Sequence, residues 1–246
     1  KSMIAELYGK ETGCAMGLGG SMHLIDIKAN VVAAVPIVGS TIPIGVGVAW
    51  SNKLKGKNND ITVIYFGDGA TEEGVFHESL DFASLFELNI LFVCENNFYS
   101  VYSPMNVRQF DKRSALNLAK SHGLQGNYGD GSSVMEVIKK TKNGLNYIKK
   151  NNKPFFLEFT TYRFIEHCGP NNDDNLKYRN KSEIDKWLRK DPIKLIEKYL
   201  MKKNKNFLLE KEKIIKKINL ELEKSFNHAK KARFPASKYL KEHLYG

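Results

Sequence analysis

The sequence predicts an α/β fold: a doubly wound, mostly parallel sheet with a helical C-terminal extension. Three apolar runs rich in β-branched and aromatic residues, at residues 61–66, 90–94 and 155–159, have the length and composition of buried strands. Segments with helical apolar spacing lie between them. Strands that alternate with helices favour a parallel sheet covered by helices.

Glycines punctuate the region before the first predicted strand, from Gly13 to Gly39, and permit tight turns and close packing. A small-residue helix that includes residues 44–49 follows them. After the first strand, the apolar positions of residues 71–88 fall on one helical face. Glu72 and Glu73 stand near the positive end of this predicted helix, which accounts for them without a paired-carboxylate site.

The second half of the chain continues the alternation with a predicted helix at residues 133–149, before the last strand. Residues 166–179 are polar and irregular, which is typical of an active-site loop. A helix is expected to start at Asp191-Pro192, because proline is tolerated in a first turn. A lysine-rich helix with an apolar stripe follows. We interpret residues 1–246 as one domain in which residues 190–246 form a helical extension.

Composition limits the partners that the protein is expected to have. The net charge is +11, but only six of the 38 basic residues are arginine, and no nucleic-acid-binding motif is present. This favours a solvated lysine-rich surface, with an acidic partner or polyanion as the alternative. No run of eighteen apolar residues indicates a membrane span, and three scattered cysteines suit a reducing compartment. We therefore expect a cytoplasmic protein that binds neither nucleic acid nor membrane.

Polar residues directly follow the first two predicted strands. Asp68 lies between Gly67 and Gly69, and Asn97 follows the second strand. Ligands bind beyond the carboxyl ends of parallel strands, and carboxylate, amide and carbonyl oxygens suit Mg²⁺. The glycines allow main-chain N–H groups to approach a diphosphate at a helix N-terminus. This pattern predicts a metal-diphosphate site, although Gly-Asp-Gly alone also fits an ordinary strand-to-helix turn.

The spacing of these motifs is similar to that of a known enzyme family. Gly67-Asp68-Gly69, a gap of 26 residues and Asn96-Asn97 resemble the thiamine-diphosphate motif. Further stretches resemble the α subunits of the first component of 2-oxo acid dehydrogenase complexes, of the pyruvate or acetoin dehydrogenase type. They are residues 8–13 (YGKETG), 19–23 (GGSMH), 37–39 (IVG), 67–70 (GDGA), 94–97 (CENN), 161–163 (TYR) and 232–235 (ARFP). The resemblance covers nearly the whole chain.

The resemblance implies thiamine diphosphate and Mg²⁺ as cofactors. It gives Asp68, Asn97 and the main-chain carbonyl of Tyr99 as metal ligands. It also implies contacts of Gly69 and Ala70 with the diphosphate, and of the Val38 backbone with the aminopyrimidine. The full set of expected cofactor-binding residues is Val38, Gly67, Asp68, Gly69, Ala70, Asn97, Tyr99 and His167.

Two histidines are expected to be catalytic. His167 matches a loop histidine near the reacting thiazolium carbon, where it can stabilise charge or move a proton. His23 follows a glycine-rich turn and is expected to line the same pocket. The alternatives are a surface-loop histidine at 167 and a structural one at 23. Cys168 invites a nucleophile hypothesis, but the resemblance requires no thiol there.

Some positions depart from the family pattern. Pro36 stands where the family commonly has glycine, which puts the backbone near the pyrimidine in doubt. The family's Tyr-Arg pair for the diphosphate lies upstream of position 1, so we expect the N-terminal part of the family to be missing from this sequence. The loop after His167 lacks the serines that are phosphorylated in mitochondrial members, and kinase control there is not supported.

The resemblance also implies partners. In the family a β subunit supplies the glutamate that activates the cofactor, and no segment here resembles that subunit. We therefore expect an α₂β₂ assembly that cleaves a pyruvate-like 2-oxo acid or acetoin and passes the acyl group to a lipoyl acyltransferase. The alternatives are a split transketolase-like carboligase and a non-catalytic cofactor-binding paralogue. Retention of Asp68, Asn97 and His167 together argues against the paralogue.

Overall fold

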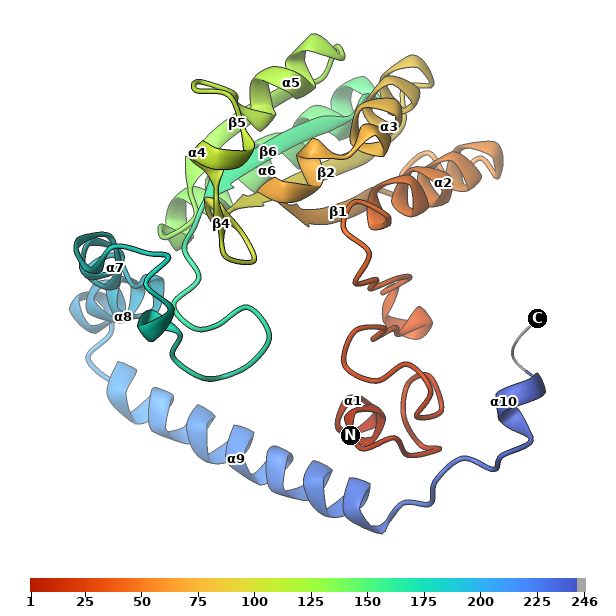
Figure 1. The fold of residues 1–246 in the computed structure, drawn as a ribbon, viewed down its shortest axis with the longest axis vertical. Helices are drawn as coiled ribbons and strands as arrows, with labels where there is room; N and C mark the ends of the chain where they lie inside the picture. Colours follow the sequence, from red (N-terminus) through yellow and green to blue (C-terminus); the bar gives the residue numbers. More distant parts are fainter. Residues whose placement is uncertain (243–246) are drawn as a thin grey trace. The chain divides into compact units, whose positions relative to one another are not determined.

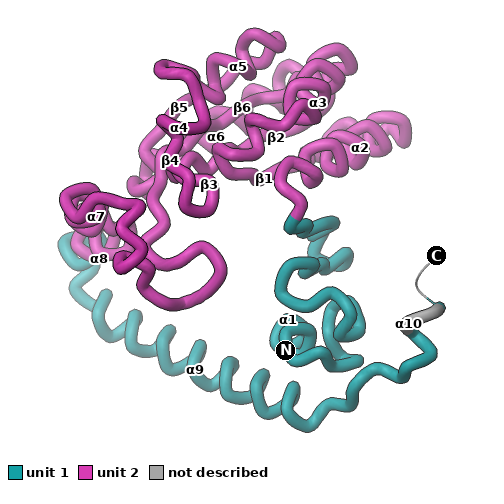
Figure 2. Tube along the Cα trace, in the orientation of Figure 1, with its two compact units in different colours: residues 1–36, 200–246 teal, residues 37–199 magenta. Residues whose placement is uncertain are grey.

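The computed structural model describes residues 1–242, which divide into two compact units (Figure 2). The larger unit is Ile37–Tyr199, and the smaller unit combines Lys1–Pro36 with Leu200–Gly246. Each unit is described by itself. The interpretation of residues 1–246 as one domain stays a prediction.

The larger unit contains a four-stranded parallel sheet with the strand order β1-β2-β6-β5. β1 (Thr62–Gly67), β2 (Ile90–Asn96) and β6 (Phe155–Thr160) correspond to the three predicted strands. The fourth, β5 (Gln125–Asp130), is not among the predicted strands because its sequence QGNYGD carries a single large apolar residue. Its glycines allow close packing: a Cβ on Gly126 would lie 2.5 Å from the Leu116 side chain.

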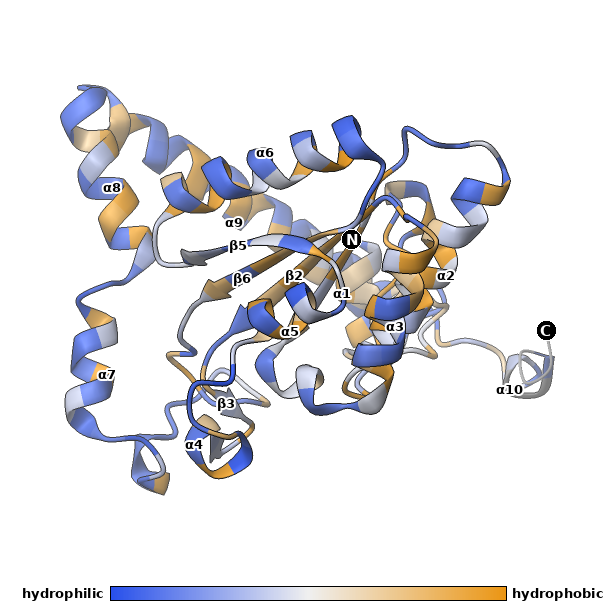
Figure 3. Cartoon of the chain, turned by 90° about the horizontal axis from the view of Figure 1, so that it is seen from above, coloured by the Kyte–Doolittle hydropathy of each residue, from blue (hydrophilic) through white to orange (hydrophobic). Residues whose placement is uncertain are grey.

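Helices cover both faces of this sheet, which confirms the predicted fold class. α2 (Thr41–Leu54), α3 (Gly74–Leu85) and α5 (Ala115–Ser121) share one core with the sheet, and α6 (Val134–Asn151) packs on the other face. Figure 3 shows the apolar strands β2 and β6 between α6 on one side and α3 and α5 on the other. The alternation of β2 explains the two cores, because Ile90, Phe92 and Cys94 enter the first core, and Leu91 and Val93 enter the second.

Short elements follow the carboxyl ends of the strands. After β1 comes the 3-10 helix η2 (Asp68–Glu72). After β2 come the hairpin strands β3 (Tyr99–Ser100) and β4 (Ser103–Pro104), and then α4 (Met105–Arg108). After β6 come η3 (Asp174–Leu176) and α7 (Lys181–Leu188). The helix predicted from residue 71 begins three residues later, at Gly74, because the Thr71 hydroxyl donates to the Asp68 carbonyl (2.7 Å) inside the tighter η2 turn.

In the smaller unit, α1 (Ser2–Leu7) packs against the long α9 (Phe207–Lys231), as the red and blue helices of Figure 1 show. Ile4 and Ala5 form a small core with Ala229. The ring centroids of Tyr8 and Phe226 are 6.1 Å apart. The unit also contains η1 (Ile27–Ala29) and α10 (Tyr239–Glu242), and α8 (Pro192–Lys203) connects the two units along the chain. α8 and α9 confirm the predicted helical extension.

The glycine-rich segment of the smaller unit folds around one carboxylate. Glu6 is fully buried, and each of its two carboxylate oxygens accepts two main-chain N–H groups at 2.7–3.1 Å. The four donors are Ala15, Gly17, Gly19 and Gly20. Gly13 must be glycine, because a Cβ there would lie 2.2 Å from the Glu6 carboxylate and 2.8 Å from its Cα. Buried charge without such donors is costly, so these bonds determine the path of the segment.

Within residues 1–242, no helix combines the length and the apolar character that crossing a membrane requires.

Candidate functional site

The loops that follow β1 and β2 meet at one end of the sheet, beyond the carboxyl ends of the strands. Gly67 is the ladder partner of Glu95, so the carboxyl ends of the two strands are level. Asp68 and Asn97 follow directly, and the Asn97 N–H donates to Asp68 Oδ1 at 3.3 Å. The structure therefore brings the Asp68 carboxylate next to the main chain of Asn97, the two residues that the sequence indicated as metal ligands.

A strained turn presents Asn97 to Asp68. Phe98 has a φ of +69°, in the left-handed region that costs a non-glycine residue on the order of 1 kcal/mol or more. Hydrogen bonds hold it: Asn97 Oδ1 accepts the Tyr99 N–H (2.9 Å), and Asn96 Oδ1 accepts the Phe98 N–H (3.1 Å). The Tyr99 main chain is thereby fixed next to Asn97, and the expected role of its carbonyl as a metal ligand stays a prediction.

The buried Glu158 on β6 supports this turn and is not among the residues that the sequence indicated. It accepts the Asn96 Nδ2 amide at 2.9 Å with one oxygen, and the Leu116 N–H at 2.9 Å with the other. The Ser114 hydroxyl donates to it at 3.2 Å. Glu158 thus ties the end of β2 to the start of α5. Its signal in the sequence is a lone acidic residue inside an otherwise apolar strand.

Gly67 and Gly69 flank Asp68 in the turn after β1. A Cβ on Gly69 would lie 2.9 Å from Ser100 Oγ and 3.2 Å from Ser100 Cβ, so a side chain here would require Ser100 to shift. Ala70 is buried, and a Cβ on Gly67 would meet nothing nearer than the Glu95 carbonyl, at 4.0 Å. Three of the residues expected to hold a diphosphate therefore form one continuous turn beside Asp68.

Two arginines that sequence reasoning did not select contact the same turn. Arg108 Nη2 lies 2.6 Å from Asp68 Oδ2, and Nη1 contacts Glu72. Arg113 donates to the Thr71 hydroxyl (2.8 Å) and carbonyl (2.5 Å), and burial lowers the pKa of its guanidinium. Glu72 is therefore an ion-pair partner in η2, and not a residue of the first turn of α3.

The Tyr99 side chain points to another element. Its hydroxyl donates to the Glu183 carboxylate of α7, with both oxygens at 2.9–3.0 Å. Burial, together with this carboxylate, raises the pKa of the Tyr99 phenol well above its usual range. The side chain thus anchors the hairpin, and only the Tyr99 carbonyl is left as a candidate metal ligand.

The expected pyrimidine contact, Val38, is exposed and precedes a glycine that packs against the same region. Gly39 has a φ of +86°, and a Cβ there would lie 3.1 Å from the Glu73 side chain. The backbone at residues 38–39 therefore runs alongside the junction of η2 and α3. The position is consistent with the expected contact of Val38, which stays a prediction.

The loop that carries His167 is held at its base by a buried ion pair. Arg179 pairs with Asp173, both almost fully buried, and Arg179 Nη1 donates to the Arg163 carbonyl at 2.5 Å. Arg163 in turn donates to the Val101 carbonyl of the hairpin at 2.8 Å. His167 is exposed within this loop. The base of the loop is therefore fixed to the hairpin that follows Asn97, while the histidine stays accessible.

His23 was expected in the same pocket. It is exposed and belongs to the smaller unit, whereas Asp68 and Asn97 belong to the larger one. Its catalytic role stays a prediction.

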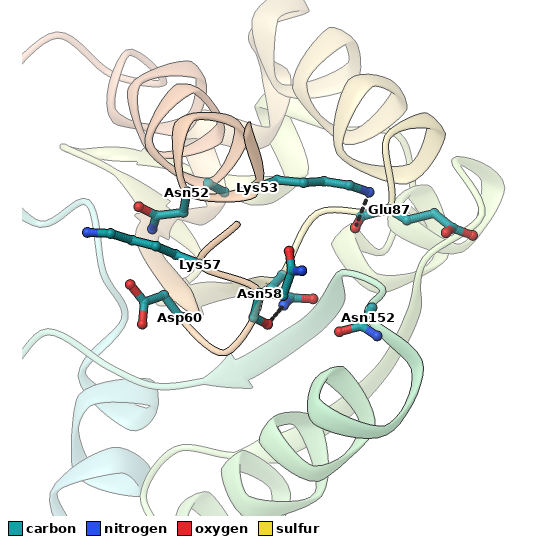
Figure 4. Close-up of a pocket in the computed structure, with 9 residues that line it drawn as sticks. Asn52, Lys53, Lys57, Asn58, Asp60, Glu87 and Asn152 are labelled. Atoms are coloured by element: carbon teal, nitrogen blue, oxygen red, sulfur yellow. Dashed lines mark hydrogen bonds between the residues drawn. The ribbon is translucent and has the colours of Figure 1, made fainter. Parts of the chain in front are cut away.

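A small cavity of about 40 Å³ lies at the opposite edge of the sheet (Figure 4). Its lining comes from the segments that precede the strands, and the Lys53 amine donates to the Phe86 carbonyl there at 2.7 Å. Ligands of parallel sheets bind at the carboxyl ends, so this cavity is not the candidate site. Within the described part of the chain, no three His, Cys, Asp or Glu side chains are grouped to hold a metal. The predicted magnesium site differs in kind, because it uses a single carboxylate.

The chain is similar to known proteins over most of its length. The family described as "Dehydrogenase E1 component" matches residues 1–238. The pyruvate dehydrogenase E1 component subunit alpha of Rickettsia felis is 36% identical over 201 residues, which cover 82% of this chain and 60% of the relative. The chloroplastic alpha-3 subunit of Arabidopsis thaliana is 31% identical over 250 residues, covering 100% of this chain and 58% of the relative.

The chain thus spans about three-fifths of the length of the relatives that it matches. A solved thiamin diphosphate-dependent enzyme from Mycobacterium smegmatis aligns with a TM-score of 0.42 and 18% identity, over 54% of this chain and 24% of that one.

Proposed function

Because the chain belongs to the dehydrogenase E1 component family, we propose that it is the α subunit of a thiamine-diphosphate- and Mg²⁺-dependent 2-oxo acid dehydrogenase. Its substrate is a pyruvate-like 2-oxo acid or acetoin. The acyl group passes to a lipoyl group on a separate acyltransferase, and a β subunit completes an α₂β₂ enzyme. The identity of 31–36% to proteins named pyruvate dehydrogenase E1 alpha subunits supports this proposal.

The observation that carries the proposal is the bond from the Asn97 N–H to the Asp68 carboxylate at the carboxyl edge of the sheet. It supports the proposal because it joins the Asp68 carboxylate, in the turn after β1, to the main chain of the turn after β2, which carries the Asn97 amide and the Tyr99 carbonyl. Hard oxygen donors of this kind suit Mg²⁺, which commonly keeps phosphate oxygens as further ligands. The glycine at 69, where a Cβ would press against Ser100, favours close approach of a diphosphate to main-chain N–H groups.

The roles of the chain's own residues follow from this arrangement. Asp68, Asn97 and the Tyr99 carbonyl hold the metal, while Gly67, Gly69 and Ala70 bind the diphosphate, and Val38 contacts the aminopyrimidine. Thiamine diphosphate supplies the thiazolium carbon that attacks the oxo group and stabilises negative charge. His167, accessible on its loop, stabilises charge or moves a proton near that carbon. His23 is the second residue that we expect to be catalytic.

The metal assignment is tested by Asp68→Asn, with Glu95→Gln as the matched control. Both substitutions remove one negative charge at the same edge, but Glu95 is exposed. Titration calorimetry with Mg²⁺ and thiamine diphosphate should give a loss of affinity of at least about tenfold for Asp68→Asn, since a hard cation loses its charged ligand. Equal affinities of the two variants would refute the metal site.

The requirement for a β subunit is tested by an activity assay of the purified protein. The substrates are pyruvate, 2-oxobutanoate, branched 2-oxo acids and acetoin, with an artificial electron acceptor. We expect no turnover by this protein alone, and turnover after addition of the β subunit. Robust turnover without a partner would place the activating carboxylate within this protein and refute the requirement for a second subunit.

A further inference from the structure

Arg108 is the one side chain that contacts both acidic residues of the η2 turn through ion pairs that the structure describes. Its guanidinium reaches Asp68 Oδ2 at 2.6 Å and also contacts Glu72. Its Nε–H donates to the Ser103 carbonyl at 3.0 Å, and the side chain is only 11% exposed. This cation therefore binds the oxygen of Asp68 that is not occupied by the Asn97 N–H.

The same guanidinium also lies near the glycine turn. A Cβ built on Gly69 would be 3.7 Å from Arg108 Nη1, so the guanidinium lies on the side of Gly69 from which a side chain would project. Arg108 thus borders both halves of the proposed site: the carboxylate that takes the metal and the main chain that takes the diphosphate.

We propose that Arg108 is an additional cofactor-binding residue that exchanges partners, from the Asp68 carboxylate to the diphosphate, when the metal-diphosphate pair binds. This inference rests on the proposed function. A guanidinium and a divalent cation at Asp68 Oδ2 repel each other, so they compete for this oxygen. The diphosphate offers the displaced guanidinium several negatively charged oxygens, which the planar fork of N–H donors of arginine can bind in pairs.

The local structure allows this exchange without unfolding. α4 is a four-residue helix, and its neighbours Val107 and Phe110 are 71% and 85% exposed. Glu72 keeps a second partner when Arg108 leaves, because Gln109 Nε2 donates to it at 2.5 Å. Rotation of the arginine side chain therefore leaves one carboxylate hydrogen-bonded and delivers the other to the metal.

The exchange predicts that Arg108→Gln changes the affinities for Mn²⁺ and for diphosphate in opposite directions. Removal of the competing guanidinium should raise the affinity for Mn²⁺, measured without diphosphate, by about tenfold, which corresponds to the loss of one partly buried ion pair. The same substitution removes the N–H donors that would bind the diphosphate. It should therefore lower the affinity for inorganic diphosphate, titrated at saturating Mn²⁺, by about tenfold. Electron paramagnetic resonance of free Mn²⁺ measures the first quantity, and calorimetry of the purified protein measures the second.

Two further variants and Asp68→Asn complete the experiment. Lys112→Gln removes the same charge from an exposed position of the same loop and should change neither affinity by more than about twofold, since exposed charges interact weakly. Arg108→Lys keeps the charge but not the fork, so Mn²⁺ binding should stay near wild type while diphosphate binding weakens.

Unchanged Mn²⁺ and diphosphate affinities in Arg108→Gln, with Asp68→Asn impaired, would overturn the exchange and leave the proposed function standing. Weaker binding of both ligands in Arg108→Gln would overturn the competition, because Arg108 would then only support the site. Absence of an Asp68-dependent Mn²⁺ site in the wild-type protein would overturn both the inference and the metal assignment on which it rests.

Discussion

The strongest test of the fold is Glu6→Gln, which changes one atom of a buried side chain. The carboxylate accepts four main-chain N–H groups, two on each oxygen. An amide has one acceptor oxygen and one NH₂ group. In either orientation, the NH₂ group of the substituted side chain would therefore point at two N–H donors that have no other acceptor in this geometry.

The magnitude follows from the bonds that are lost. Hydrogen bonds to a charged group contribute about 1.5 kcal/mol each at the low end, so losing two destabilises the smaller unit by about 3 kcal/mol. A change of this size makes local opening of the glycine-rich segment about a hundredfold more frequent. The helices of the larger unit should be unaffected.

Hydrogen exchange is the appropriate assay, because it resolves the four donor amides from the rest of the chain. We expect about hundredfold faster exchange at Ala15, Gly17, Gly19 and Gly20 in Glu6→Gln, where opening limits exchange. Glu11→Gln, an exposed change in the same unit, should leave these rates unchanged. Equal protection in Glu6→Gln and wild type would refute the view that the carboxylate organises this segment.

The same carboxylate predicts a pH dependence. Burial raises the pKa of the Glu6 carboxyl, but the four backbone N–H groups lower it by more, so its net pKa lies below the ordinary value. A group with a depressed folded-state pKa contributes stability that is fully present above its unfolded pKa and is lost as the pH falls through the folded value. Protection of the four amides should therefore decline below about pH 4, near the unfolded pKa. Glu6→Gln should show no such decline.

Three further substitutions test the larger unit. His167→Ala should lower turnover of the assembled, cofactor-saturated enzyme by roughly 10²–10⁴-fold and change cofactor affinity much less; near-normal turnover, with assembly checked by light scattering, would remove it from the catalytic residues. Arg179→Met leaves Asp173 buried without its partner and should reduce the free energy of unfolding by about 3–5 kcal/mol, measured by denaturant titration against Arg189→Met. Gly69→Ala places a Cβ 2.9 Å from Ser100 Oγ and should weaken thiamine diphosphate binding in calorimetry. Ser100→Ala in the same chain should restore part of that affinity, and no effect of Gly69→Ala would show that the turn tolerates a side chain.

The strands that could be predicted are those whose own sequence is a recognisable apolar run. β1, β2 and β6 are continuous or alternating apolar runs, because they are buried by helices on one or both faces. β5 carries no such signal: Gly126 and Gly129 are required by the close packing of neighbouring side chains, and small residues do not reveal a strand. Its place at the sheet edge depends on α5 and α6, which lie elsewhere in the sequence.

The same distinction applies to the candidate site. Asp68 and Asn97 could be predicted, because each directly follows a recognisable strand and parallel strands end at one edge. Glu158 and Arg108 could not, since their side-chain partners lie 36–62 residues away along the chain and the pairing depends on the folded loops. The predicted start of α3 lies three residues too early for a related reason: the helical apolar pattern does not report the 3-10 turn that Thr71 and Asp68 form.

The positions of the few arginines among many lysines also indicate where the site lies. In a chain with 38 basic residues, lysine dominates, and only six positions are arginine. Four of these six lie in the segments that follow β2 and β6: Arg108, Arg113, Arg163 and Arg179. The first three donate hydrogen bonds to another loop or turn beyond the carboxyl ends of the strands, and Arg179 donates to the Arg163 carbonyl within its own loop. A lysine ammonium is a compact, strongly hydrated charge, whereas the guanidinium presents several donors in a fixed plane. Arginine in a lysine-rich sequence therefore marks positions where geometry and not charge is required, and in this protein those positions surround the proposed cofactor site.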